Sequence, residues 1–256
     1  MAKSMCENNL RQAVDALAQA QHVIALTGAG ISVESGIPDF RSPTGLWAQY
    51  PPEKYATIEG YVRNPDEVWK LWYQLGKMLQ DIQPNSGHRS LAALEELGLL
   101  RGVITQNIDN LHQEAGNSHV VEFHGNNSHL RCMQCHKRIP LNLELPGDKA
   151  PRCDCGGLMK PDVVLFGEML PPYAVLESEI LIQECDLMLV VGTSATVYPA
   201  AELPIIAREN GAYIIECNLE PTQLTDNITD SFLAGPAGET LPALLEALHA
   251  LQPETS

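Results

Sequence analysis

The sequence predicts an α/β protein built on a parallel, doubly wound sheet, and two observations support this prediction. Short apolar runs of strand length recur along the chain, and stretches with helical spacing lie between several of them. Strands that alternate with helices form a parallel sheet with helices on its faces. Two of the runs, LMLVV and YII, are apolar at every position, as strands buried on both faces should be.

The predicted elements follow one another in a regular order. Residues 7–20 are expected to form a helix, because Leu10, Val14, Leu17 and Ala18 recur at helical spacing. The run HVIALTGAG then reads as a strand, a tight turn and the start of a helix. Later strands are expected in GVITQN, HVVEFHG, DLMLVVGTS and AYIIECN, with helices such as HRSLAALEELGLL and AAELPIIAREN between them.

Two segments interrupt this alternation and predict a smaller second domain. Residues 44–84 are rich in aromatic side chains and mostly helical in pattern, and residues 126–160 hold a cysteine cluster and many turn-forming residues. We therefore expect residues 1–43, 85–125 and 161–256 to form the large domain and the two insertions to form the small one.

The chain is strongly acidic. Its 256 residues include 16 lysines and arginines against 32 aspartates and glutamates, a formal net charge of −16. Such a surface repels the phosphate backbone, so we expect no direct nucleic-acid partner. The same charge suits cationic partners such as lysine-rich protein tails, although an ordinary solvated acidic surface has the same composition.

The sequence contains no predicted membrane segment. The most apolar stretch, LMLVVGTSATVYPAAELPIIA, is interrupted by Gly192, Pro199, Glu202 and Pro204, whereas a membrane helix needs roughly 20 apolar residues. The stretch MAKSMCENNLRQAVDALAQA has no apolar core of signal-peptide length. Four of the seven cysteines cluster at metal-ligand spacing instead of forming a distributed disulfide framework, so we expect a cytoplasmic protein.

The turn TGAGIS follows the first predicted strand. Gly28 would permit a tight turn and Gly30 would let the backbone approach a pyrophosphate, which the following helix N-terminus would bind through free N–H groups. The third glycine of the dinucleotide-binding fingerprint is missing, because position 33 is valine. Two glycines are a weak signal, and such turns also occur without a ligand.

The cysteine cluster predicts a structural zinc site. Cys132 and Cys135 are followed by Cys153 and Cys155, and four thiolates at this spacing suit tetrahedral zinc with no open position for a substrate. The second pair is Cys-x-Cys, so His136 or Asp154 could instead complete the ligand set. Unligated thiols are the alternative interpretation, and a nucleic-acid-binding zinc ribbon is disfavoured by the acidic charge.

Polar residues collect where two predicted strands end. TQNIDNLH brings Gln106, Asn107 and Asp109 to the carboxyl end of one strand, where open α/β sheets place their ligands. Helix capping would account for one of these three residues. His124 follows the strand HVVEF at the same edge, and it suits a general base near neutral pH, although a lone histidine is more often structural.

Taken together, these motifs resemble one family. GAGIS, GIPDFRS, TQNIDNLH, FHG, the paired cysteines, KPDVVLFGE and GTS occur in the order found in sirtuins, the NAD-dependent protein lysine deacylases, from about residue 20 to about residue 240. The resemblance implies a Rossmann-like large domain, a small zinc lobe, and NAD as a co-substrate in the cleft between them. Acyl-lysine proteins or peptides would be the partners, entering the cleft from the other side.

The resemblance also implies the roles of individual residues. His124 matches the catalytic histidine, which accepts a ribose proton after the acyl oxygen has attacked the ribose and nicotinamide has left. Asn107 would orient the ribose. The residues implied to contact NAD are Gly28, Ala29, Gly30, Phe40, Arg41, Gln106, Asn107, Ile108, Asp109, Gly192, Thr193, Ser194, Asn218 and Ala237.

The segment KPDVVLFGE, residues 160–168, resembles the stretch to which the family adds its peptide as an extra strand. The resemblance places Val164, Phe166 and Gly167 against the peptide, with the Val164 carbonyl accepting the amide N–H of the acyl-lysine. The opposing strand would come from residues 196–198, with Val197 at its centre. VVLF is also typical of a core strand.

The resemblance bears on which acyl group is removed. Family members that prefer succinyl or malonyl lysine carry a Tyr-x-x-Arg pair in the helical insertion, whose arginine pairs with the acyl carboxylate. In WYQLGKM, residues 72–78, Tyr73 is interpreted as the tyrosine and Gly76 as the position without the arginine. We therefore expect neutral acyl chains to be preferred over succinyl or malonyl groups.

Three other classes of protein remain as alternatives. A protein ADP-ribosyltransferase on the same fold would not need the histidine base at position 124. A non-catalytic NAD- or peptide-binding module would not need Asn107, Asp109 and His124, so the presence of all three argues against it. A hydride-transferring dehydrogenase would share the glycine turn but has no use for the remaining motifs.

Overall fold

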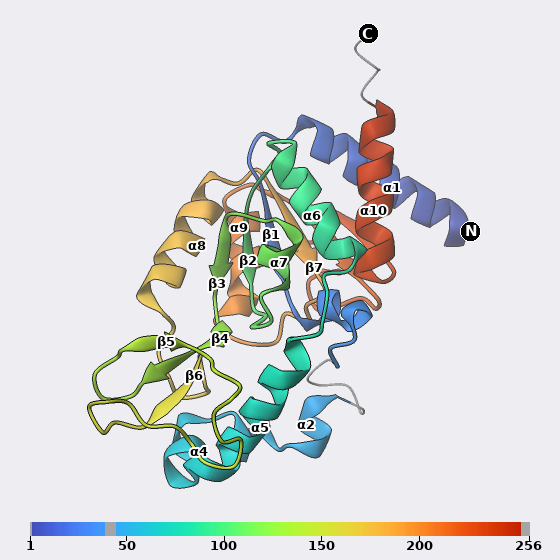
Figure 1. The fold of residues 1–256 in the computed structure, drawn as a ribbon. Coiled ribbons are helices and arrows are strands. Elements are labelled where there is room, and N and C mark those ends of the chain that lie inside the picture. The colour runs from blue at the N-terminus through green and yellow to red at the C-terminus, as the bar shows by residue number, and fades with distance from the viewer. Residues whose placement is uncertain (1, 39–44, 252–256) are drawn as a thin grey trace.

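The computed structural model describes residues 2–38 and 45–251 and contains a six-stranded and a three-stranded sheet (Figure 1). The six-stranded sheet has the order β3-β2-β1-β7-β8-β9, and every neighbouring pair in it is parallel. This confirms the predicted fold class. Its strands are β1 (Val23–Thr27), β2 (Leu100–Thr105), β3 (Val120–Glu122), β7 (Leu187–Val191), β8 (Tyr213–Asn218) and β9 (Ser231–Ala234).

The strand order reverses beside β1. The chain proceeds from β1 outward through β2 to β3, returns to β7 on the other side of β1, and then continues outward to β8 and β9. In an open parallel sheet, such a reversal leaves a crevice at the carboxyl ends of the two central strands. The ends of β1 and β7 are therefore where a ligand should bind.

Helices cover both faces of this sheet, because successive side chains of each strand point to opposite sides. Val23 and Ala25 of β1 enter one apolar core, and Ile24 and Leu26 enter the other. The first core is covered by α1 (Ala2–Gln19), α6 (Ser86–Glu96) and α10 (Ala237–Leu251), and the second by α8 (Pro172–Glu184) and α9 (Leu203–Glu209). The elements α8, β9 and α10 were not predicted from the sequence.

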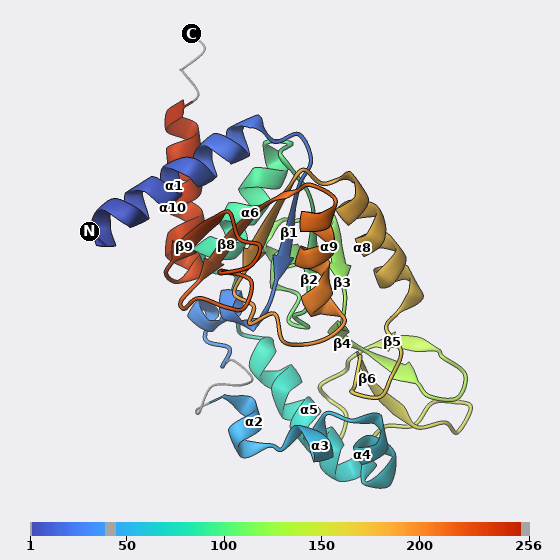
Figure 2. The same cartoon turned by 180° about the vertical axis from the view of Figure 1, so that it is seen from behind.

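The small domain combines the antiparallel sheet β5-β4-β6 with a group of helices, and Figure 2 shows both on the same side of the large domain. Its core holds the large buried side chains of Tyr61 and Trp69. The predicted boundary after residue 160 falls inside a strand of this sheet. The elements are α2 (Leu46–Gln49), α3 (Pro52–Tyr55), α4 (Ile58–Arg63), α5 (Pro65–Leu79), β4 (Gly125–Cys132), β5 (Arg138–Pro140) and β6 (Met159–Val163).

Three short elements complete the description: η1 (Ala29–Ser35), α7 (Leu111–Ala115) and η2 (Ala200–Glu202). Within residues 2–38 and 45–251, no helix combines the length and apolar character that crossing a bilayer requires.

Two buried histidines pack against each other in the large domain. The rings of His88 and His112 have centroids 4.9 Å apart, and neither side chain is more than 1% exposed. Burial, with a smaller contribution from Arg89, lowers the pKa of His88 to about 4. Burial, with a smaller contribution from His88, lowers the pKa of His112 to about 3. Both imidazoles are therefore neutral in the folded protein near neutral pH.

We expect this pair to make the folded state less stable in acid. Below a pKa of about 6.5 the unfolded chain binds protons that the folded chain does not, so the free energy of unfolding falls as the pH drops from 6.5 toward 4. Each histidine should contribute on the order of 1–2 kcal/mol between pH 6.5 and pH 5. The free energy of unfolding, measured with urea at pH 6.5 and at pH 5, should fall less in His112→Gln than in wild type. The control His249→Gln changes an exposed histidine and should show the wild-type fall. An unchanged pH dependence in His112→Gln would contradict this account.

Candidate active site

A cavity of about 630 Å³ lies at the carboxyl ends of the central strands. Residues that follow β1, β2, β7 and β8 line its large-domain side, and α5 and the chain after β6 line its small-domain side. Its volume is within the range of sites for drug-sized ligands and cofactors. The strand reversal thus places the cavity where the sequence motifs were expected to meet.

The glycine turn forms one wall of the cavity by packing against the end of β7. The N–H groups of Gly28 and Gly30 donate to the carbonyls of Val191 and Gly192, at 3.0 and 2.8 Å. A Cβ on Gly28 would lie 2.8 Å from the Thr193 side chain, and one on Gly30 would lie 2.7 Å from the Gly192 Cα. Gly28 is in the extended region, with φ −130°. These glycines are therefore required by the contact between two turns, a reason that the local sequence did not indicate.

Asn107 and Gln106 are held in place from several directions. The Asn107 side-chain amide donates to the Gly28 carbonyl and to the Ser32 hydroxyl, both at 3.1 Å. The Gln106 side-chain amide donates to the Thr193 hydroxyl at 3.0 Å. Both residues line the cavity. Helix capping does not explain either side chain, because their amide groups bond across the strand ends.

Asp109 combines a capping role with a second contact. One carboxylate oxygen accepts the N–H of Leu111, at the start of α7, at 3.1 Å, and the other accepts the Ser32 hydroxyl at 2.7 Å. Burial raises the pKa of Asp109, and the hydrogen bond from Ser32 opposes this shift. Asp109 lines a small apolar cavity of about 20 Å³ next to the main one, together with Asn107 and Ile108.

His124 lines the main cavity, and one contact indicates which nitrogen of its neutral ring carries the proton. Its Nδ1 atom lies 3.2 Å from the carbonyl oxygen of Gln106. A carbonyl only accepts, so Nδ1 carries the proton and Nε2 is the unprotonated nitrogen. Burial lowers the pKa of His124, with the bond to Gln106 opposing it. The imidazole is therefore neutral near pH 7 and can accept a proton at Nε2.

The chain after β6 presents an extended edge to the cavity. The N–H of Val164 donates to the His124 carbonyl at 2.8 Å, and the N–H of Phe166 donates to the Ala56 carbonyl at 2.8 Å. The Val164 carbonyl takes no part in these bonds. Val164, Phe166 and Gly167 line the cavity together with Val197. Leu165, between Val164 and Phe166, is bonded to Glu168: its N–H donates to the Glu168 carboxylate at 2.9 Å, and its carbonyl accepts the Glu168 N–H at 3.0 Å.

Four predicted contact residues are not among the described residues that line either cavity. Phe40 and Arg41 lie outside the described residues. Ala237 is buried against the Gly87 position of α6 and does not line the cavity. Tyr73 does not line it either: its hydroxyl donates to the Leu143 carbonyl at 2.6 Å, within the small domain.

Trp72 of α5 lines the cavity where Tyr73 was expected. Adjacent residues on a helix point about 100° apart, so an error of one position turns the side chain away from the cavity. The residue three positions after Trp72 on the same face is Leu75, which lines the small cavity beside Asp109. Gly76, which was expected at this place, instead contacts the side chains of Leu141 and Leu143.

Several lining residues were not anticipated from the sequence. Besides Trp72 they include Glu168, which ends the KPDVVLFGE segment, and the four residues 219–222 directly after Asn218. The polar and turn-forming composition of NLEPT at the end of a predicted strand is the signal that could have identified the second group.

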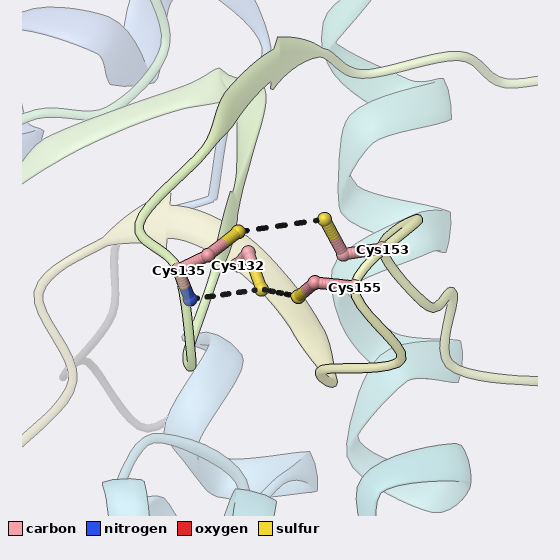
Figure 3. A group of neighbouring side chains, drawn as sticks. All are labelled: Cys132, Cys135, Cys153 and Cys155. Atoms are coloured by element: carbon pink, nitrogen blue, oxygen red, sulfur yellow. Dashed lines mark hydrogen bonds between the residues drawn. The ribbon is translucent and has the colours of Figure 1, made fainter.

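The four clustered cysteines converge in the small domain, as Figure 3 shows. Their sulfur atoms all lie within 4.8 Å of one another, with Cys132 and Cys155 3.6 Å apart and Cys135 and Cys153 3.7 Å apart. Four ligands at about 2.3 Å from a tetrahedral zinc ion have edges of roughly 3.8 Å. The donor set therefore fits a structural zinc ion held by these four thiolates.

The two alternative ligands do not join this cluster. Asp154 forms an ion pair with Lys137, at 2.7 Å, and His136 is not in the group of converging donors. Gly157 provides the space for the metal site, since a Cβ there would lie 2.7 Å from the Cys132 sulfur.

Three features together are typical of a dinucleotide-dependent enzyme. They are the parallel sheet, the glycine turn at its strand reversal, and the second domain with the four-cysteine metal site. The chain belongs to the Sir2 family, whose model matches residues 28–199. This confirms the resemblance inferred from the motifs, together with NAD as co-substrate and zinc as the structural metal.

Individual relatives cover nearly the whole chain. This chain is 47% identical to NAD-dependent protein deacylase 2 of Pyrobaculum aerophilum over 233 residues, which are 91% of this chain and 93% of that protein. A mutant Sir2 homologue in complex with ADP-ribose has a TM-score of 0.92 and 39% identity, covering 96% of this chain and 99% of that one. Sir2Af2 bound to a myristoylated histone peptide has a TM-score of 0.81 and 39% identity, covering 97% and 100%.

Proposed function

We propose that this NAD-dependent protein deacylase removes acetyl and other neutral acyl groups from lysine side chains, transfers them to ADP-ribose and releases nicotinamide. The observation that carries the proposal is the position of a neutral imidazole, His124, on the same cavity as Asn107 and the chain after β6. We also propose a cytoplasmic location, which remains a prediction from the cysteine usage.

The site residues divide the work between binding and proton transfer. Bound NAD supplies an electrophilic ribose carbon and nicotinamide as its leaving group. Asn107, with its amide held by Gly28 and Ser32, orients the ribose hydroxyls toward His124. The Nε2 atom of His124 accepts the proton of the hydroxyl that attacks the acyl carbon, while the Gln106 carbonyl holds the protonated Nδ1.

The nicotinamide end and the peptide end are assigned to separate parts of the cavity. Ile108 and Asp109 would contact the carboxamide, next to the small apolar cavity. The acyl-lysine peptide would add as a strand between Val164 and Val197, with main-chain hydrogen bonds supplying most of the affinity. Such binding needs little sequence selectivity, which suits several protein substrates.

The proposal is tested by measuring nicotinamide release from NAD with and without an acetyl-lysine peptide. We expect release only with the acetylated peptide, together with equal amounts of deacetylated peptide and O-acetyl-ADP-ribose. The unmodified peptide is the control. Transfer of ADP-ribose to the peptide would identify a protein ADP-ribosyltransferase instead, and no nicotinamide release would contradict the proposal.

The lining of the cavity supports a preference for neutral acyl groups. Among the described residues that line it, Glu168 and Glu220 are the charged groups and none is lysine or arginine. At the position where the resemblance expects the arginine of the Tyr-x-x-Arg pair, this chain has Gly76. An acyl carboxylate would therefore enter a site with no described cation to neutralise it, which is unfavourable by several kcal/mol.

We expect kcat/KM for a succinyl-lysine peptide to be at least about 100-fold below that for the same acetyl-lysine peptide, corresponding to about 3 kcal/mol. Equal rates on the two peptides in wild type would refute this expectation.

A further inference from the structure

A carboxylate that the mechanism does not use lies beneath the unpredicted wall of the cavity. Glu216 is on β8, two residues before Asn218, and its side chain is 0% exposed. Ile214, two residues earlier on the same face of the strand, belongs to the apolar core beneath α8 and α9. Among the described residues, no ion pair involves Glu216.

Three threonine hydroxyls satisfy this carboxylate. Thr222 donates to Oε1 at 2.6 Å, and Thr225 and Thr229 donate to Oε2 at 2.7 and 2.9 Å. All three belong to the segment after β8 that contains no helix or strand before β9. Both oxygens of the buried side chain therefore accept hydrogen bonds from one loop, residues 219–230, which we call the threonine loop.

Two of the three hydroxyls also accept a backbone N–H. The Thr222 hydroxyl accepts the N–H of Leu224 at 3.1 Å, and the Thr225 hydroxyl accepts the N–H of Thr222 at 2.8 Å. Each of the three hydroxyls donates its single proton to Glu216. A carboxylate accepts on both oxygens, whereas an amide of the same shape donates from one of its two ends. Only an acidic side chain at position 216 matches this loop.

The loop that Glu216 holds is also a wall of the cavity. Leu219, Glu220, Pro221 and Thr222 line the cavity that the Gly28–Gly30 turn lines. The buried Leu224 anchors the loop in the apolar core, and the Gln223 amide donates to the Ala195 carbonyl just after the lining residues Thr193 and Ser194. Thr222 itself both lines the cavity and donates to Glu216, so the carboxylate acts on the shape of the wall.

We infer that Glu216 is a positioning residue for NAD: through the threonine hydroxyls it holds residues 219–222 in the conformation that receives the adenosine half of the dinucleotide. The assignment of this half follows from the sirtuin resemblance, which implies that Asn218 holds the adenosine ribose. Asn218 lies directly before the loop, and its side chain donates to the Thr193 carbonyl at 3.0 Å. The inference rests on the proposed position of NAD in the cavity. Under this inference Glu216 does not contact NAD itself. It affects the affinity for NAD through the threonine loop.

The test measures the dissociation constant of ADP-ribose by calorimetry, because this binding needs no chemistry. Glu216→Gln keeps the size of the side chain but leaves at least one hydroxyl without an acceptor, and it should weaken ADP-ribose binding about tenfold. The KM for the acetyl peptide and kcat at saturating NAD should remain near wild type. Glu209→Gln removes an exposed negative charge from the same domain and should leave the ADP-ribose affinity unchanged.

Thr229 provides a second test that does not depend on Glu216→Gln folding. It does not line the cavity, so Thr229→Val should weaken ADP-ribose binding through the loop alone, and Thr229→Ser should retain wild-type affinity. In the double variant Glu216→Gln/Thr229→Val, the loss of ADP-ribose binding free energy should be smaller than the sum of the losses in the two single variants.

Wild-type affinity in both Glu216→Gln and Thr229→Val would overturn the inference. A parallel rise in the ADP-ribose dissociation constant and the peptide KM with a lower melting temperature would overturn it too, because that pattern indicates general destabilisation. Deacylation by the wild-type enzyme tests the proposed function separately.

Discussion

His124→Ala should lower kcat for deacylation by about 10²- to 10⁴-fold, the usual contribution of a general base. NAD binding and the fold should persist, because the hydrogen bond of the His124 side chain within residues 2–38 and 45–251, to the Gln106 carbonyl, can be replaced by water. Exchange of labelled nicotinamide into NAD should survive better than product formation, since the base acts after nicotinamide has left. Both rates are measured on the same acetyl-lysine peptide.

The pH profile and a second variant separate proton transfer from binding. Because burial lowers the pKa of His124, the wild-type rate should fall with decreasing pH only below 6.5, as the imidazole becomes protonated. This acidic limb should disappear in His124→Ala. Asn107→Ala should impair nicotinamide exchange and deacylation together, because Asn107 acts before the first bond breaks. Equal losses of exchange and product formation in His124→Ala would place His124 in binding instead.

Cys132→Ala should unfold the small domain and abolish deacylation. Cys132 is buried in the same apolar core as Trp69 and Met159, at the end of β4, the central strand of the three-stranded sheet. A structural zinc ion supplies roughly 10–16 kcal/mol of apparent binding free energy, which this small core would lose. The activity would be lost indirectly, because Trp72 and the chain after β6 line the cavity.

Zinc content by mass spectrometry, the melting temperature and the deacylation rate should all fall in Cys132→Ala. The control is Cys185→Ala, which removes a buried free thiol from the end of α8 and should keep one zinc ion per chain. A metal-free protein with the wild-type melting temperature and rate would contradict a structural role for the metal.

The features that the sequence predicted correctly depend on short-range patterns. The continuously apolar runs identified β7 and β8, because a strand buried on both faces excludes polar residues at every position. The spacing of the four cysteines identified the metal site, because ligands close in the chain form a tetrahedral shell with little rearrangement. The order of the motifs identified the family.

Elements without such a pattern were not predicted. The helix α8 carries apolar residues around much of its circumference, with Tyr173, Leu176 and Ile180 exposed, so its periodicity does not mark a buried face. The strand β9 has only four residues, too few for periodicity to be distinguished.

The tertiary structure alone decided how residues far apart in the chain meet. Whether Trp72 or Tyr73 of α5 faces the cavity depends on how the helix packs against the strands of the small domain, since a rotation of about 100° exchanges them. Gly28 and Gly30 are required by the turn at Gly192, and the two acceptor oxygens of Glu216 match threonine hydroxyls in the next loop. Local propensity and spacing determine which elements form, but side-chain environments arise from contacts between elements, and those contacts exist only once the chain has folded.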